Sequence, residues 1–312
     1  MNKIKNSISL VINTKNEEKN LKDCIESAIP IIDEIIVVDM QSKDQTIQIA
    51  KKYNAHSYTV KDYGYVEPAR NFALKKATKD WILLLDADER LTPYLCKIIP
   101  TLINKKYNGF YFPRKNIILK KWIQHGVWWP DYSLKLFRNG FVKWSDKIHS
   151  QPELEGKSYR MGALQLNAII HHNIIDIDDL VQSLNRYSDA EKDFKTKNIT
   201  TVEKLISYLD SEFKWRYIEH LGYLDGLHGF ILGKFMNFYR LLEFSKFWES
   251  NNYEDFFNPL DLKKAVIKDN YNLQQENEKL KIELNKIQSS KFYLIWQLYC
   301  QKRDNIKNKL FK

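Results

Sequence analysis

The chain has 312 residues, of which 44% are hydrophobic and 13% aromatic, so it can bury the core of at least one large domain. Its formal net charge of +10 indicates an anionic partner, such as nucleic acid, an anionic membrane or a phosphorylated substrate. Lysines are scattered, and the sequence has no zinc-finger spacing and no evident aromatic RNA-binding signature, so we expect no nucleic-acid partner.

The cysteines and the apolar runs indicate a cytoplasmic protein. Cys24, Cys96 and Cys300 are far apart and odd in number, which is typical of free thiols in a reducing compartment. The apolar run from Ile8 to Ile12 is too short for a signal peptide. No run approaches the roughly 20 apolar residues of a membrane-spanning helix.

Strands and helices alternate at short intervals in the first part of the chain, which predicts an α/β fold with a mostly parallel sheet covered by helices on both faces. The expected strands are residues 7–13, 34–38, 56–60 and 80–85, and the expected helices are residues 21–28, 46–52 and 68–77.

The sequence pattern changes further along the chain. From Gly109 to about His172, short aromatic runs alternate with Gly, Pro and basic residues, which predicts extra strands and loops that complete a site. From Asp178 onward the pattern is helical. We therefore expect a catalytic domain at residues 1–175 with halves of about 1–90 and 91–175, a helical region at 176–260, and a helical tail at 261–312.

An acidic motif follows the apolar strand of residues 81–85. Asp86 and Asp88 project to the same side if the chain stays extended, because side chains alternate along a strand. Two carboxylates at the end of a parallel strand suit Mg²⁺ or Mn²⁺ and lie where such sheets bind ligands. A simple acidic turn before a helix is the alternative.

A second polar loop follows the strand of residues 34–38. Asp39 can accept the imide N–H of uracil there, while the loop that includes Ser42 holds the ribose. Arg70, at the start of the next helix, could clamp the nucleotide part. A helix cap and a surface arginine are the competing interpretations of these residues.

Together these segments resemble the family 2 inverting glycosyltransferases of GT-A fold. The resemblance covers roughly residues 7–172, and its motifs are Val11-Ile-Asn-Thr14-Lys-Asn16-Glu17-Glu18, Val38-Asp39-x-x-Ser42-x-Asp44-x-Thr46, Ala69-Arg70-Asn71, Leu85-Asp86-Ala-Asp88-Glu89, Trp129-Pro-Asp131, Lys135-Leu-Phe-Arg138-Asn-Gly140 and Ile148-His149. The chain looks closest to the subgroup that adds glucose to the inner core of lipopolysaccharide. Gly222-Tyr-Leu-Asp225-Gly226-x-x-Gly229 resembles that subgroup more weakly.

The resemblance implies a UDP-sugar that lies across the strand ends, with a divalent metal on its diphosphate. The implied donor-binding residues are Thr14, Asn16, Glu17, Asp39, Ser42, Arg70 and Asp86. The implied metal ligands are Asp86 and Asp88. His149 is either a further metal or phosphate ligand or a core histidine, and His171-His172 is a weaker case of the same kind.

An inverting reaction needs a general base on the acceptor side. Asp131 is the first candidate, because the preceding tryptophans suit a sugar ring, and Glu89 is the second. An ordinary turn acid is the alternative for Asp131. The subgroup's His-Glu pair is His149-Ser150 here, which leaves no such Glu.

Two helical segments predict partners. Residues 217–248 form either an amphipathic helix on a membrane surface or a helix packed on the catalytic domain. Further on, Val266, Leu273, Leu280 and Ile287 recur every seven residues, with Asn270 and Asn277 at the other core position. This heptad pattern predicts a parallel coiled-coil homodimer, and a solvated helix is the alternative.

We therefore expect an enzyme that moves a sugar, by default glucose, onto a hydroxyl of a bacterial surface glycan such as lipopolysaccharide core. It would work on the inner face of the membrane. Transfer to polyprenyl phosphate is an alternative in the same fold. A silent scaffold is an alternative of another class, and a glycoside hydrolase is disfavoured, because no second carboxylate pair lies across a bond.

Overall fold

The computed structural model describes residues 6–145, 151–196 and 199–289. Two compact units can be distinguished, one of residues 1–198 and 208–252 and the other of residues 199–207 and 253–312. The first unit holds the sheet and most helices, and the second holds the long helix α8 (Pro259–Gln288). The predicted boundaries near residues 175 and 260 stay predictions.

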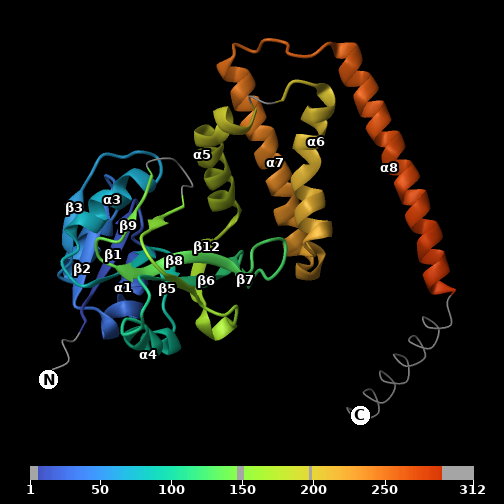
Figure 1. The fold of residues 1–312 in the computed structure, drawn as a ribbon. Coiled ribbons are helices and arrows are strands. Elements are labelled where there is room, and N and C mark those ends of the chain that lie inside the picture. The colour runs from blue at the N-terminus through green and yellow to red at the C-terminus, as the bar shows by residue number, and fades with distance from the viewer. Residues whose placement is uncertain (1–5, 146–150, 197–198, 290–312) are drawn as a thin grey trace, which may run out of the picture. The chain divides into compact units, whose positions relative to one another are not determined.

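The sheet of the first unit has the order β3-β2-β1-β4-β8-β6-β12-β5, with β7 and β11 paired to β6 (Figure 1). A separate small sheet pairs β9 with β10. The strands are β1 (Ile8–Thr14), β2 (Glu34–Asp39), β3 (His56–Thr59), β4 (Trp81–Asp86), β5 (Glu89–Arg90), β6 (Gly109–Ile118), β7 (Lys121–Trp122), β8 (Asp131–Arg138), β9 (Val142–Lys143), β10 (Glu153–Leu154), β11 (Ser158–Arg160) and β12 (Ile169–Ile174).

The α-helices are α1 (Leu21–Ala28), α2 (Thr46–Lys52), α3 (Glu67–Lys76), α4 (Pro93–Leu102), α5 (Ile177–Thr196), α6 (Val202–Phe213), α7 (Leu227–Ser250) and α8. Short 3-10 or π turns occupy Ile29–Ile31, Gln165–Asn167, Lys214–Glu219 and Gly222–Asp225. Every predicted strand and helix up to residue 86 is present, whereas α4 was not predicted.

The first four strands are parallel, and the sheet becomes mixed where β8 joins β4 antiparallel. Buried β-branched and leucine residues fill β1, β2 and β4, as expected for strands covered on both faces. One core cluster joins the sheet to α1, α2 and α4, and a second joins its other face to α3. The carboxyl ends of β1, β2 and β4 consequently share one edge.

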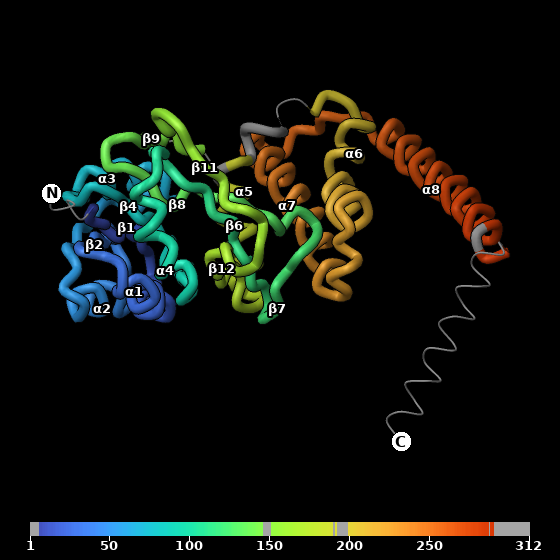
Figure 2. Tube along the Cα trace, turned by 60° about the horizontal axis from the view of Figure 1, so that its bottom comes forward, coloured from blue at the N-terminus to red at the C-terminus, as the bar shows by residue number. Residues whose placement is uncertain are grey.

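Helix α7 packs along α5 in the first unit, as the ribbon and the Cα tube both show (Figures 1 and 2). Leu232 and Tyr239 of α7 meet Leu180 and Leu184 of α5 in a third core cluster. Most of the segment from 217 to 248 is thus a helix packed on the catalytic domain, one of the two alternatives that its sequence left open. None of the described helices is long and apolar enough to span a membrane.

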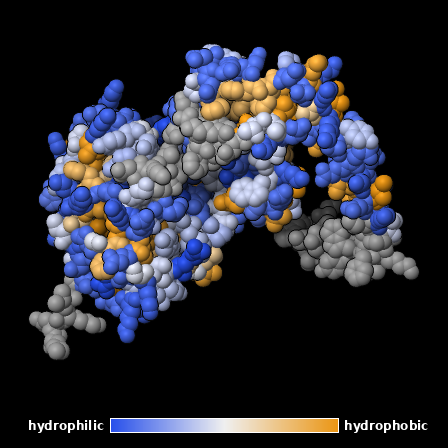
Figure 3. All heavy atoms as spheres, turned by 45° about the horizontal axis from the view of Figure 1, so that its top comes forward, coloured by the Kyte–Doolittle hydropathy of each residue, from blue (hydrophilic) through white to orange (hydrophobic). Residues whose placement is uncertain are grey.

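Helix α8, taken by itself, is exposed over most of its length. Every described side chain from Asn270 to Lys286 is exposed, including Leu273, Leu280 and Leu284 at 50%, 55% and 52%. On the face drawn in Figure 3, hydrophilic side chains dominate and hydrophobic ones gather in separate patches.

Candidate active site

The strand ends bring the predicted acids together. In the parallel register Thr14 pairs with Asp39, and Asn13 pairs with Asp86. Because β1, β2 and β4 are adjacent and run in one direction, the loops after them leave from the same edge of the sheet. The residues predicted from separate motifs therefore form one group.

Asp39 organises the loop after β2. Its buried carboxylate accepts hydrogen bonds from the Thr14 hydroxyl (3.2 Å), the Ser42 backbone N–H (2.9 Å) and the Ser42 hydroxyl. The Asn16 side chain accepts the backbone N–H of Lys43 (2.8 Å), and the Asn16 N–H donates to Ser42 Oγ (2.7 Å). Four of the predicted donor-binding residues thus hold the two loops against each other.

Asp86, the first acid of the motif after β4, is paired with two cations. Arg70 Nη2 lies 3.1 Å from Asp86 Oδ1, and Lys135 Nζ lies 2.9 Å from Asp86 Oδ2. Burial by itself would raise the pKa of Asp86, but the charges of Lys135 and Arg70 outweigh it and hold this pKa well below its ordinary value. Both oxygens of Asp86 are therefore engaged by the protein.

Glu89 is completely buried and belongs to the same network. Lys135 Nζ lies 2.6 Å from Glu89 Oε2, which also accepts the backbone N–H of Asp86 (3.0 Å). Arg114 approaches the other oxygen at 3.8 Å. Lys135 is itself 1% exposed, so its ammonium group is a buried bridge between two carboxylates. This position of Glu89 favours a structural role over that of a base that meets an acceptor.

Asp131, at the start of β8, is partly exposed and paired on one oxygen. Arg114 Nη2 (2.7 Å) and Asn116 Nδ2 (3.1 Å) both contact Asp131 Oδ2. Burial by itself would raise the pKa of Asp131. The charge of Arg114 and the hydrogen bonds from Arg114 and Asn116 outweigh burial, so the pKa lies below its ordinary value. Among the described residues, Oδ1 has no polar partner, so its lone pairs are left for a bound molecule.

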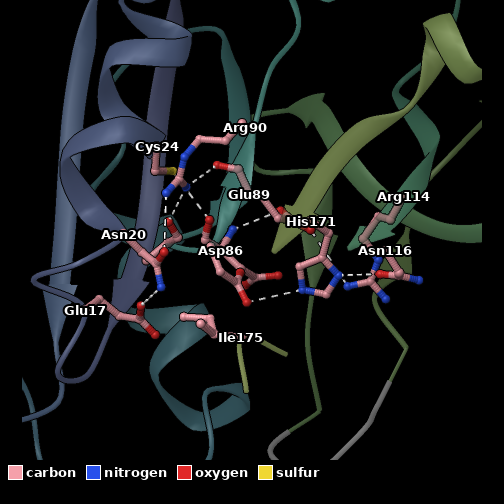
Figure 4. A network of polar contacts seen from close by, with 12 residues as sticks. Glu17, Asn20, Cys24, Asp86, Glu89, Arg90, Arg114, Asn116, His171 and Ile175 are labelled. Carbon is pink, nitrogen blue, oxygen red and sulfur yellow. Dashed lines mark hydrogen bonds and ion pairs between the residues drawn. The ribbon is translucent and has the colours of Figure 1, made fainter. Parts of the chain in front are cut away.

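Asp88 differs from Asp86, Glu89 and Asp131, because within the described ranges no Lys or Arg pairs with it. Its polar neighbour is His171, whose Nε2 lies 3.3 Å from Asp88 Oδ2. The other ring nitrogen, Nδ1, lies 2.6 Å from Asn116 Oδ1, which fixes the orientation of the ring. Figure 4 shows His171 between Asn116 and the acidic group. In the part of the chain that the structure describes, Asp88 Oδ1 is buried without a hydrogen-bond partner.

Glu17 lies on the other side of this acidic group, beside Asn20 (Figure 4). Burial raises the pKa of Glu17 from 4.5 to about 7. A hydrogen bond from Asn20 (2.9 Å) opposes the rise, and the charges of Asp88 and Asp86 add to it. The site therefore holds a carboxyl that titrates near neutral pH.

Three residues of the site were not predicted as site residues from the sequence. Lys135 stands in an apolar strand, where a buried lysine could have signalled a carboxylate partner. His171 was a weaker candidate than His149, which lies outside the described residues. Asn13 is the next-to-last residue of the apolar strand β1 and, among the described residues, its buried amide has no hydrogen-bond partner. A polar residue that directly follows the apolar run was the available signal for Asn13.

Part of the sequence matches a known protein family. Residues 9–152 match the model of Glycosyl transferase family 2. The sheet and its helices confirm the expected GT-A type of α/β fold, with a helical C-terminal region. The chain thus carries a family 2 glycosyltransferase domain, and the protein is a glycosyltransferase.

Several relatives are similar over most of their length. An uncharacterized glycosyltransferase of Rickettsia typhi is 27% identical over 286 residues, which is 85% of this chain and 91% of the relative. The lipopolysaccharide core biosynthesis glycosyltransferase LpsC of Rhizobium meliloti is 27% identical over 72% of this chain and 85% of its own. The crystal structure of S. aureus TarS 1–349 is 15% identical, covers 77% of this chain and 91% of that one, and has a TM-score of 0.39.

The raised pKa of Glu17 predicts a pH-dependent stability. The folded protein binds this proton more tightly than the unfolded chain, so the contribution of Glu17 is full below pH 4.5 and is lost as the pH rises through about 7. Glu17→Gln keeps the side chain neutral. We expect its melting temperature to gain about 2–4 °C over that of the wild type between pH 5.5 and pH 8, which corresponds to about 1 kcal/mol.

Differential scanning fluorimetry across this pH range measures the gain. Glu153→Gln, which removes an exposed acid from β10 outside the site, is the matched control and should show no such trend. A Glu17→Gln difference that is constant with pH would contradict the assignment.

Proposed function

We propose that the protein is a metal-dependent inverting glycosyltransferase that uses a UDP-sugar, with glucose as the default sugar. One observation carries the proposal. Of the four acids Asp86, Asp88, Glu89 and Asp131, three are paired with Arg70, Lys135 or Arg114, whereas Asp88 has no cationic Lys or Arg partner among the described residues. A partly exposed carboxylate with one buried, unpartnered oxygen favours a bound cation.

The residues present fit a divalent metal, although no group of three or more protein ligands is assembled within the described ranges. Asp88 and His171 would hold it, since Mg²⁺ and Mn²⁺ sites commonly combine one or two protein ligands with substrate phosphates. When bound, such a metal neutralises negative charge on the departing diphosphate. The pairing of Asp86 with Arg70 and Lys135 supports a role for Asp86 in holding Arg70 toward the donor.

Asp131 is the general base in this proposal. Oδ2 is fixed by Arg114 and Asn116, and Oδ1 takes the proton from the acceptor hydroxyl as that oxygen attacks the anomeric carbon. The new bond forms on the face opposite the departing UDP, so the configuration inverts. The lowered pKa of Asp131 keeps it ionised throughout the neutral range. The rings of Trp122 and Trp129 meet edge to face at 5.3 Å nearby in the chain and suit a sugar acceptor.

We place the acceptor among bacterial surface glycans, such as the lipopolysaccharide core, and the enzyme in the cytoplasm at the inner face of the membrane. The similarity to LpsC supports this choice. A polyprenyl phosphate acceptor is the rival in the same fold, because it is already an anion and needs no base. A scaffold without turnover is the rival of another class.

Activity measurements distinguish these readings. With Mn²⁺ and UDP-glucose or another UDP-sugar, the purified protein should release UDP slowly, and a glycan acceptor should accelerate the release. Asp131→Asn should lower transfer to a hydroxyl by a factor of about a hundred to ten thousand, because the base is lost. Asp178→Asn, a change at an exposed acid on α5, should leave the rate unchanged. Release of UDP is followed by a coupled assay.

Each other outcome identifies a rival. An Asp131→Asn protein with full activity would favour the phosphate acceptor. No turnover and no Mn²⁺-dependent binding across the common UDP-sugars would favour the scaffold.

The proposal includes a parallel homodimer through α8. Val266, Leu273 and Leu280 lie seven residues apart and are about half exposed, so no described part of their own chain covers them. Most helical stability in proteins comes from packing of an apolar face rather than from intrinsic propensity, and a second copy would cover the stripe. Asn270 and Asn277 at the other core position favour two parallel strands in one register. Glu276 of one copy then lies near Lys281 of the other.

Light scattering of the full chain tests the dimer. Leu280→Glu places a charge in the stripe and should yield a monomer, whereas Lys279→Glu, one residue away on the outer surface, should stay dimeric. If the wild type and both variants share one mass, α8 is not what joins the copies.

A further inference from the structure

A cluster of large apolar side chains is exposed where the turns before α7 meet the start of that helix. Between residues 215 and 230 their exposed fractions run from 39% to 70%. We call this surface the apolar tip, and it consists of Trp215, Ile218, Leu221, Tyr223, Leu224, Leu227 and Phe230. Single exposed apolar residues are ordinary, but a concentration of this kind marks an interaction surface.

Aromatic contacts show that the tip is one surface. The Tyr217 ring lies 6.3 Å from the ring of Tyr223 and 5.7 Å from that of Phe230. Phe213 lies 5.6 Å from Phe230 on the same side. Residues from the turn at Lys214–Glu219, the turn at Gly222–Asp225 and the start of α7 are thereby joined.

The backbone of the tip is held in place by hydrogen bonds to a neighbouring loop. The buried carboxylate of Asp225 accepts the backbone N–H groups of Gln124 (3.1 Å) and His125 (2.8 Å), and Lys121 Nζ donates to the Asp225 carbonyl (2.6 Å). The Gly126 N–H donates to the His220 carbonyl (2.8 Å). Asp225 thus ties the tip to the loop between β6 and β8.

Two glycines of the same motif let the backbone pack closely at the tip. A Cβ atom on Gly229 would lie 1.9 Å from the carbonyl oxygen of Gly222, so no side chain fits there. Leu221 has left-handed backbone angles (φ 58°, ψ 25°), which are uncommon outside glycine, yet its side chain is 44% exposed. The left-handed backbone of Leu221 is therefore kept although it is unfavourable for leucine, and it leaves the side chain exposed to solvent.

Basic residues flank the tip. Lys120 and Lys214 are exposed, and Lys121 is half-buried beside Asp225. Arg216 is offset by its ion pair with Glu212 (2.7 Å), and Glu219 is the acid exposed within the segment. The four cations Lys120, Lys121, Lys214 and Arg216 exceed the three acids Glu212, Glu219 and Asp225 by one, so the rim carries a small positive excess. An apolar surface with tryptophan and tyrosine, bordered by lysines, matches the interface of an anionic bilayer.

We infer that the apolar tip docks on an anionic membrane surface and holds the enzyme there. The remainder of α7 packs on α5, so the contact is made by the turns and the first part of α7 rather than by the length of the helix. This inference concerns binding to lipid and stands independently of the donor and acceptor. A second copy of the chain is the other occupant that the test below can reveal.

Co-sedimentation of the full chain with vesicles tests the inference. Vesicles that contain phosphatidylglycerol in phosphatidylcholine should bind the protein, and pure phosphatidylcholine should bind it more weakly. Leu224→Ser together with Leu227→Ser should lower the partition coefficient about tenfold or more, because apolar burial is lost. Lys120→Glu with Lys214→Glu should weaken binding to the anionic vesicles, and added salt should reduce wild-type binding as well.

The matched control is Leu164→Ser with Leu166→Ser, which alters exposed leucines of the same unit away from the tip and should bind as the wild type does. Melting temperatures of all variants show that each is folded. Brominated lipids should quench part of the wild-type fluorescence, and Trp215→Phe should remove that part.

Three results would overturn the inference. The wild type could fail to bind the anionic vesicles, or the tip variant could bind them as well as the wild type does. A concentration-dependent self-association that Leu224→Ser with Leu227→Ser abolishes, without lipid binding, would show that the tip joins two copies instead.

Discussion

The site depends on the compensation of negative charge at the edge of a parallel sheet. The ends of β4, β5 and β8 bring Asp86, Glu89 and Asp131 into one network, and like charges this close would repel one another without counter-ions. Buried Lys135 bridges Asp86 and Glu89, and Arg114 links Glu89 to Asp131. Among the described residues, these lysine and arginine side chains pair with Asp86, Glu89 and Asp131 but not with Asp88. The electrostatic arrangement, rather than the acidic motif alone, marks the position for a cation.

Much of the fold could be predicted from the sequence, because short buried strands and amphipathic helices leave strong local patterns. The strand ends at Asp39 and Asp86 followed from where apolar runs stop. The partners of these acids could not be predicted in this way. Lys135 and His171 reach the site from β8 and β12, and those strands join the sheet through long-range pairings that no local pattern encodes.

The C-terminal part shows the same limit. Amphipathicity left two interpretations for residues 217–248, and only packing against α5 separates the covered part of α7 from the exposed tip. The packing at the tip accounts for Gly222, Asp225 and Gly229. The two glycines permit close backbone contact, and the Asp225 carboxylate accepts backbone N–H groups of the neighbouring loop. The motif could be found in the sequence, but the contacts that its residues make could not be predicted, because they are made to a loop about a hundred residues earlier in the chain.

Mn²⁺ binding in the presence of UDP, measured by titration calorimetry or electron paramagnetic resonance, tests the central claim most directly. The account predicts that Asp88→Asn lowers Mn²⁺ affinity by about a hundredfold or more, while Asp131→Asn, which changes an acid already paired with Arg114, binds Mn²⁺ as the wild type does. An Asp88→Asn protein that is folded and binds Mn²⁺ with undiminished affinity would contradict it.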